Sequence, residues 1–102
     1  MVLCTLPDNQ SAQKMAETLV GEKLAACCNI VPKLTSVYFW QGKIQHDSEA
    51  LMLIKTKESL YAKLEQRILE LHPYEVPEVI ALPVEKGSNA YLNWINQVVR
   101  ND

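Results

Sequence analysis

The sequence predicts an α+β fold built around a hairpin of two long strands. Two observations indicate this class. Apolar residues fill residues 30–40 and 44–56 in the manner of strands, and three other segments carry apolar residues at helical spacing. The two strands are joined at Gln41-Gly42-Lys43, where Gly42 can supply the positive φ of a tight turn. A chain of 102 residues corresponds to a single domain, residues 1–102.

The hairpin is long for a chain of this size. Each strand would span on the order of 35 Å, whereas a domain of about 100 residues has a radius of gyration of only ~13 Å. Both odd and even positions are apolar in residues 37–40 and 50–54, although an antiparallel sheet often keeps one face in water. Helices can cover one face, so we expect a second copy of the protein at the other face or at the tip; a second apolar layer within one chain is the alternative. The interface residues that we expect are Val37, Tyr38, Phe39, Trp40, Met52 and Ile54.

The first part of the chain predicts a strand, a helix and the first long strand. Residues 2–6 are an apolar strand that Pro7 ends, and Asp8 or Asn9 can cap the helix that follows. The chain returns to strand near residues 25–28. Because Pro32 cannot donate a ladder hydrogen bond, we expect a bulge, a bend or a sheet edge there. The apolar face of the helix is formed by Met15, Ala16, Leu19, Val20 and Leu24.

The second part predicts a helix, a strand and a last helix. Thr56 can cap the second helix, which Pro73 ends, and residues 79–82 predict a buried strand before a helix that starts near Ser88. The order is therefore βαββαβ followed by a helix. Two split βαβ units with right-handed crossovers close into a four-stranded antiparallel sheet with helices on one face. This is the ferredoxin-like arrangement.

The composition excludes several classes of protein. The net charge of −2 and a pI near 5.6 argue against a nucleic-acid partner. No apolar run approaches the ~20 residues of a membrane span, and residues 1–6 do not read as a signal peptide. Three cysteines, with Cys27 and Cys28 adjacent, do not form a disulfide framework. We therefore expect a cytoplasmic protein without membrane contact.

Five stretches together resemble the CutA family of divalent-cation tolerance proteins. They are LAACCNI at 24–30, SVYFWQGKI at 36–44, LIKT at 53–56, HPYEVPE at 72–78 and YLNWI at 91–95. The resemblance implies a ferredoxin-like protomer in a cytoplasmic homotrimer, in which the long hairpins complete sheets with neighbouring subunits. It also implies a role in tolerance to divalent cations and binding of copper.

The copper ligands attributed to the family are a cysteine that ends the first strand and two histidines before the Pro-Tyr loop. Carried over, they are Cys4 and His72, while Leu71 replaces the other histidine. A thiolate with an imidazole suits copper, and a neighbouring subunit could add His46 or Met52. Without the resemblance, Cys4 would be a small buried apolar residue, and His46 a solvated group near Asp47 and Glu49.

A cleft between subunits is an alternative binding site. Polar groups near rigid turns could hold a small anion there, as in the PII-type signal transducers, which such a trimer resembles in architecture alone. The alternatives are an ion pair at the subunit interface between Lys55 and Glu75 or Glu78, a site for a partner protein, and a scaffold with no ligand. Without a glycine-rich phosphate loop or a nucleophile elbow, we expect no enzyme. The expected cleft residues are Lys55, Thr56, Tyr74, Glu75 and Glu78.

Overall fold

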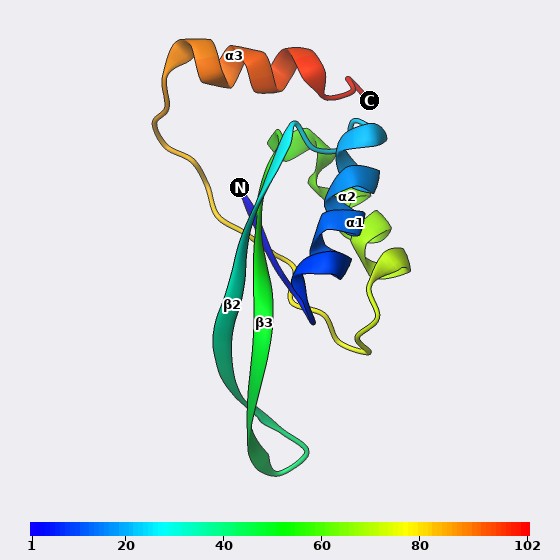
Figure 1. Cartoon of the computed structure of the whole chain (residues 1–102). Coiled ribbons are helices and arrows are strands. Elements are labelled where there is room, and N and C mark those ends of the chain that lie inside the picture. Colours follow the sequence, from blue (N-terminus) through cyan, green and yellow to red (C-terminus); the bar gives the residue numbers. More distant parts are fainter.

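A computed structural model describes residues 1–102 and contains one antiparallel sheet with the strand order β2-β3-β1-β4. Helices α1 and α2 lie against one face of this sheet, and α3 lies beyond its end (Figure 1). The order and pairing confirm the ferredoxin-like fold with an additional C-terminal helix. The elements are β1 (Val2–Leu6), α1 (Asn9–Gly21), β2 (Cys27–Trp40), β3 (Lys43–Lys55), a short 3₁₀ turn (Glu58–Leu60), α2 (Tyr61–Leu71), β4 (Ile80–Ala81) and α3 (Asn89–Val98).

The β2–β3 hairpin extends well beyond the rest of the chain (Figure 1). The molecule measures 44 × 26 × 22 Å, and the hairpin forms its long dimension. Trp40 pairs with Lys43, so the loop has two residues, and both have positive φ, 51° at Gln41 and 79° at Gly42. Positive φ at both central residues matches the type I′ turn, whose twist suits the flanking strands. The predicted tight turn is confirmed.

Pro32 lies at the expected irregularity in β2. The pairing register shifts between Val31 and Leu34, and Lys33 has a φ of 57°. Proline has no N–H to donate. The bulge places Pro32 outside the regular pairing of β2 with β3, so no hydrogen bond of the ladder is missing.

Asp8 caps a helix as predicted, whereas Thr56 does not. Asp8 caps α1, and its carboxylate accepts a hydrogen bond of 2.7 Å from the backbone N–H of Ser11, as predicted. Thr56 does not cap α2, so that prediction was wrong. Its hydroxyl instead donates to the carbonyl oxygen of Leu24 at 2.7 Å, which ties the end of β3 to the segment between α1 and β2.

Helix α1 ends in a Schellman motif without glycine. The N–H of Leu24 donates to the carbonyl of Leu19, and that of Lys23 to Val20, both at 3.0 Å. Lys23 takes the left-handed conformation that glycine usually supplies, with a φ of 61°. The buried side chains of Leu19 and Leu24 share the same core cluster, and such an apolar contact often accompanies this motif.

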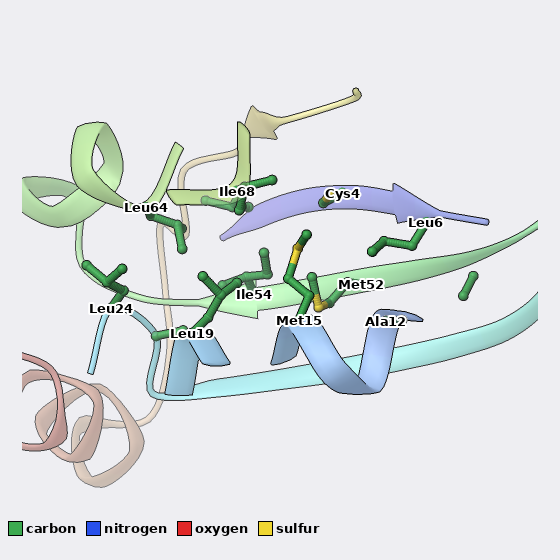
Figure 2. Close-up of a cluster of buried hydrophobic side chains, with 13 residues drawn as sticks. Cys4, Leu6, Ala12, Met15, Leu19, Leu24, Met52, Ile54, Leu64 and Ile68 are labelled. Atoms are coloured by element: carbon green, nitrogen blue, oxygen red, sulfur yellow. The ribbon is translucent and has the colours of Figure 1, made fainter. Parts of the chain in front are cut away.

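The core lies between the sheet and helices α1 and α2 (Figure 2). Alternate residues of the two inner strands face the helices, because successive side chains of a strand point to opposite faces. Met52 and Ile54 are 0% exposed in this core. They were predicted at an interface between copies, and that prediction was wrong, since neither side chain has surface to offer a second copy. The buried apolar residues of β1 and β3 are Val2, Cys4, Leu6, Ala50, Met52 and Ile54.

The end of the chain covers less of the sheet than expected. Strand β4 has only two residues, which pair with Val2 and Leu3, and Ile80 is 50% exposed. The prediction of a buried strand over residues 79–82 was therefore wrong. The strand has two residues, and both are exposed within one chain. Helix α3 packs through a separate small cluster, formed by Ala26, Leu60, Ile95 and Val99.

We expect Leu64→Ala to reduce the free energy of unfolding by about 2–5 kcal/mol, because it removes a fully buried side chain and leaves a cavity. Leu69→Ala is the matched control on the same helix, since Leu69 is exposed, and it should change stability by no more than about 0.5 kcal/mol. Urea unfolding at one fixed protein concentration measures both. Equal losses in the two variants would contradict this description of the core.

Candidate functional site

Cys4 and His72 converge on one backbone atom, the carbonyl oxygen of Thr5. The ring nitrogen Nε2 of His72 lies 2.7 Å from this oxygen, and the thiol of Cys4 donates to it weakly at 3.7 Å. Strand β1 positions Cys4, and His72 follows the last turn of α2, where Pro73 prevents further helix. The structure therefore brings together the two residues that the family resemblance implies as copper ligands.

Both ring nitrogens of His72 are engaged. The backbone N–H of Tyr74 donates to Nδ1 at 3.1 Å, so Nε2 carries the proton and donates to Thr5. A metal ligand must offer an unprotonated nitrogen, and here the lone pair of Nδ1 accepts the Tyr74 hydrogen. The side chain is only 8% exposed. In this arrangement His72 fixes the start of the loop after α2 and offers no nitrogen to a metal.

Cys4 is fully buried in the core. Burial raises the pKa of its thiol to about 12, and the negative charges of Glu78 and Glu49 act in the same direction. Since the thiolate is the form that binds metal, the buried thiol is a poor ligand at neutral pH. No group of three or more His, Cys, Asp or Glu side chains is placed to hold a metal ion. The residues present do not fit a copper centre that is ready to bind.

A cavity of about 670 Å³ lies where the loop after α2 meets the hairpin. We call it the acidic cavity, because four carboxylates and no basic side chain line it. The phenol of Tyr74 donates to Glu49 Oε2 at 2.7 Å, and burial together with this bond raises the pKa of Tyr74. The charged and phenolic residues of the acidic cavity are Tyr38, Asp47, Glu49, Tyr74, Glu75 and Glu78.

The structure divides the predicted anion cleft. Tyr74, Glu75 and Glu78 line the acidic cavity, but Lys55 and Thr56 do not. Lys55 is six residues beyond Glu49 along β3, about 20 Å at strand geometry, and its ammonium group bonds the side-chain oxygen of Asn29. No ion pair joins Lys55 to Glu75 or Glu78 within one chain. The cleft and the ion pair were predicted between subunits, so both stay predictions. The charged side chains of the acidic cavity are all acidic, and such a lining repels anions and attracts cations.

Sequence reasoning missed Asp47 and Glu49 as cavity residues and named them only as neighbours of His46 near the hairpin tip. Glu49 is only 7% exposed, and the phenol of Tyr38 bonds Asp47. A usable signal was the register: counting back from the Trp40–Lys43 pair places Asp47 opposite Ser36 on the neighbouring strand. Only the fold shows that the loop with Tyr74 reaches the same place.

Apolar side chains remain exposed on the hairpin. Phe39 is 72% exposed, and Val37, Tyr38 and Trp40 are exposed as well, as is Ile44 on the facing strand. Strand β2 pairs with β3 only, so the backbone groups on its other edge have no partner strand within the chain. The hairpin thus combines an open strand edge with uncovered apolar surface.

The buried thiol of Cys4 should make the protein less stable in alkali. The unfolded chain loses this proton near the ordinary thiol pKa of about 8.5, whereas the folded chain holds it until about pH 12. This contribution to stability is complete below the unfolded pKa and is lost as pH rises toward the folded pKa. Between these two pKa values the unfolding free energy should fall less steeply with pH in Cys4→Ala than in the unaltered protein. The expected difference in slope is up to about 1.4 kcal/mol per pH unit.

Urea unfolding across this pH range measures the effect. Leu64→Ala is the control, because it destabilises the same core without removing a titratable group. If the unfolding free energy falls with pH equally steeply in Cys4→Ala and in the unaltered protein, the pKa of the Cys4 thiol is not strongly raised.

The chain matches a family model and many known proteins. The family model of the CutA1 divalent ion tolerance protein covers residues 1–98. The divalent-cation tolerance protein CutA of Thermus thermophilus is 48% identical over 97 residues, which are 95% of this chain and 94% of that protein. Protein CutA of Homo sapiens is 50% identical over 97 residues, but these are only 54% of its length. The chain thus spans about half of the plant and mammalian relatives.

Solved structures agree with the sequence matches. CutA1 from Oryza sativa superposes with a TM-score of 0.96 at 46% identity, covering 99% of this chain and 93% of that one. CutA from Archaeoglobus fulgidus, described as a periplasmic divalent cation tolerance protein, has a TM-score of 0.94 at 34% identity over 97% of this chain and 96% of that one. Family model, relatives and structures span nearly the whole chain, and so this chain belongs to the CutA family of divalent-cation tolerance proteins.

Proposed function

We propose that this chain acts as a cytoplasmic, non-catalytic homotrimer in divalent-cation tolerance, and that it binds copper or a related divalent ion weakly. The observation that carries the proposal is the uncovered hairpin, in which Phe39 and its apolar neighbours project into solvent. The number of subunits comes from the family resemblance. None of the helices has the length and apolarity that crossing a bilayer would require.

The hairpin supports self-association in two ways. Contiguous exposed apolar side chains on a small domain mark an interaction surface, and removal of apolar area from water is the dominant favourable contribution to most protein association. The free edge of β2 can also receive a strand from a neighbour, which satisfies its backbone groups. A neighbouring hairpin supplies both an apolar partner and a strand.

The state of Cys4 and His72 supports weak rather than tight metal binding. Copper would have to displace the Tyr74 hydrogen from His72 Nδ1 and remove the proton from the buried Cys4 thiol. Both steps cost free energy that the two metal bonds must offset. With Leu71 in place of a third ligand, one chain supplies only this pair.

The acidic cavity supports a second candidate function, a PII-like module that binds a small ligand or a partner protein. Its four carboxylates favour a cationic group, in contrast to the anion expected from the sequence. Glu49 and Tyr74 already bond one another and form a fixed wall of this cavity.

The first test is the effect of Phe39→Ser on assembly. We expect the unaltered protein to sediment at three times the 11.6 kDa chain mass and Phe39→Ser to dissociate partly at low concentration. Leu69→Ser is the control, because Leu69 is also an exposed apolar residue but lies on α2, outside the hairpin. Analytical ultracentrifugation measures both. A monomeric unaltered protein at micromolar concentration would end the proposal.

The second test is a calorimetric titration with copper under reducing conditions. Cys4→Ala should weaken binding by about tenfold or more, which is the usual scale for disturbing a metal site. Cys27→Ala is the control, because this cysteine lies at the start of β2, outside the Cys4 and His72 contact. Unchanged affinity in Cys4→Ala would remove Cys4 from any copper site.

A further inference from the structure

A second cavity lies near the base of the hairpin, where Leu24 lines it and accepts a hydrogen bond from Thr56. Its volume is about 340 Å³, and it lies between the end of α1, the outer side of α2 and the residues after α3. We call it the tail cavity. Its lining is almost entirely charged, with three basic and three acidic side chains: Glu22, Lys63, Arg67, Glu70, Arg100 and Asp102.

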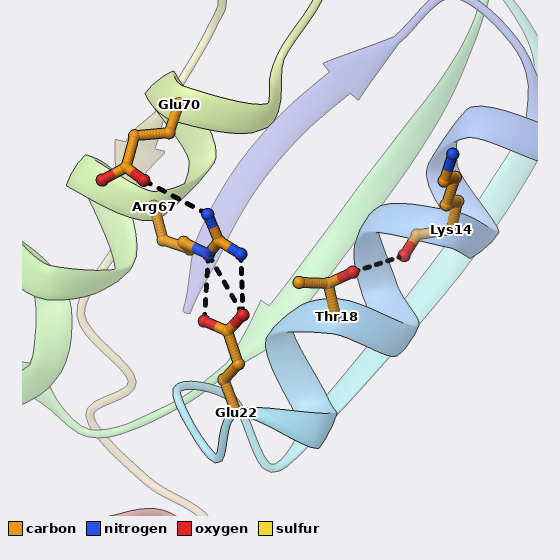
Figure 3. Close-up of polar contacts among 5 residues, drawn as sticks. All are labelled: Lys14, Thr18, Glu22, Arg67 and Glu70. Carbon is orange, nitrogen blue, oxygen red and sulfur yellow. Dashed lines mark hydrogen bonds and ion pairs between the residues drawn. The ribbon is translucent and has the colours of Figure 1, made fainter.

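Arg67 is fully engaged by two of the carboxylates (Figure 3). Its Nε and one terminal nitrogen bond Glu22 at 2.8–3.1 Å, and its other terminal nitrogen bonds Glu70 at 3.2 Å. The bidentate pair joins α2 to the end of α1 and gives the tail cavity a rigid wall. Only one carboxylate, that of Asp102, is left for the two remaining cations.

Asp102 does not satisfy both of them. Its Oδ2 lies 2.5 Å from the ammonium of Lys63, but its Oδ1 is 3.6 Å from Arg100 Nε, beyond hydrogen-bond distance. Arg100 Nε is buried and has no hydrogen-bond partner in the chain, whereas the Arg100 side chain as a whole is 39% exposed. The tail cavity therefore holds a donor that lacks an acceptor in the chain, on a guanidinium that a solute can reach.

The position of Asp102 shows that an oxyanion fits between Lys63 and Arg100. Arg100 is held in place, since its backbone N–H donates to Lys23 at 3.0 Å. Asp102 is about half exposed and follows α3 without regular structure, so it can leave without disturbing the core. The structure thus presents a carboxylate of the chain itself in a place that a separate anion could occupy.

We propose that the tail cavity binds a small phosphate-type oxyanion and that Asp102 is its internal competitor. A phosphate group carries more acceptor oxygens than a carboxylate, so it can meet the ammonium of Lys63 and the unpartnered Arg100 Nε together. Its second negative charge also favours it over Asp102. A tethered carboxylate acts at an effective concentration in the millimolar range, which weakens binding by the unaltered chain.

Titration calorimetry with inorganic phosphate tests this proposal in the full chain. We expect Asp102→Asn to bind phosphate about tenfold more tightly than the unaltered protein, because the competitor is gone. Adding Arg100→Gln or Lys63→Gln to Asp102→Asn should abolish the gain. Adding Lys14→Gln should keep it, because Lys14 is exposed on α1 outside the cavity and its loss changes the net charge equally.

Three outcomes would overturn the proposal. They are equal phosphate affinity in Asp102→Asn and the unaltered protein, a gain that survives Arg100→Gln, and a gain that Lys14→Gln also removes. A parallel titration with acetate separates a phosphate site from a general carboxylate site, and equal binding of acetate would refute the ligand class. If Arg100→Gln does not fold, as judged by circular dichroism, Arg100→Lys keeps the charge without the Nε donor and should still lose most of the gain.

Discussion

The antiparallel register of β2 and β3 is the constraint on which the rest of the molecule depends. Two local features set it: the type I′ turn at Gln41 and Gly42, and the bulge that Pro32 imposes. Because side chains alternate along a strand, a shift of one residue would move Met52 and Ile54 out of the core and replace them with their neighbours. The same register places Glu49 where the loop after α2 can reach it. Core, acidic cavity and exposed hairpin therefore all follow from one pairing.

The order of elements could be predicted from sequence because each one has a local signal. The hairpin turn, the bulge and the Asp8 cap depend on residues within a few positions of one another. The errors concern contacts between distant segments. Apolar residues fill both faces of residues 50–54, so the pattern alone could not show which face meets the helices. Lys55 was grouped with Glu75 by polarity across a subunit boundary, and within one chain the length of β3 keeps them apart.

His72 shows how a residue type can be retained while its surroundings change its chemistry. The resemblance implies a ligand, yet its ring donates to Thr5 and accepts from Tyr74, and so joins the end of β1 to the loop after α2. With Leu71 beside it, no second imidazole competes for a metal there. A neutral imidazole with a donor on one side and an acceptor on the other is well suited to this structural role. Within one chain, His72 holds Thr5 and Tyr74, two residues that line the acidic cavity, in fixed positions.

The net charge of −2 conceals a separation of charge along the molecule. Four carboxylates line the acidic cavity beside the hairpin, whereas Lys63 and Arg100 share a single carboxylate in the tail cavity. Charges more than about 10 Å apart are largely screened at physiological salt, so each cavity responds to its own lining and not to the total. The acidic cavity therefore attracts cations, whereas the tail cavity, with three basic and three acidic side chains, has an excess of positive charge only when Asp102 leaves it. Composition predicts no nucleic-acid partner, but it could not report the local charge of either cavity.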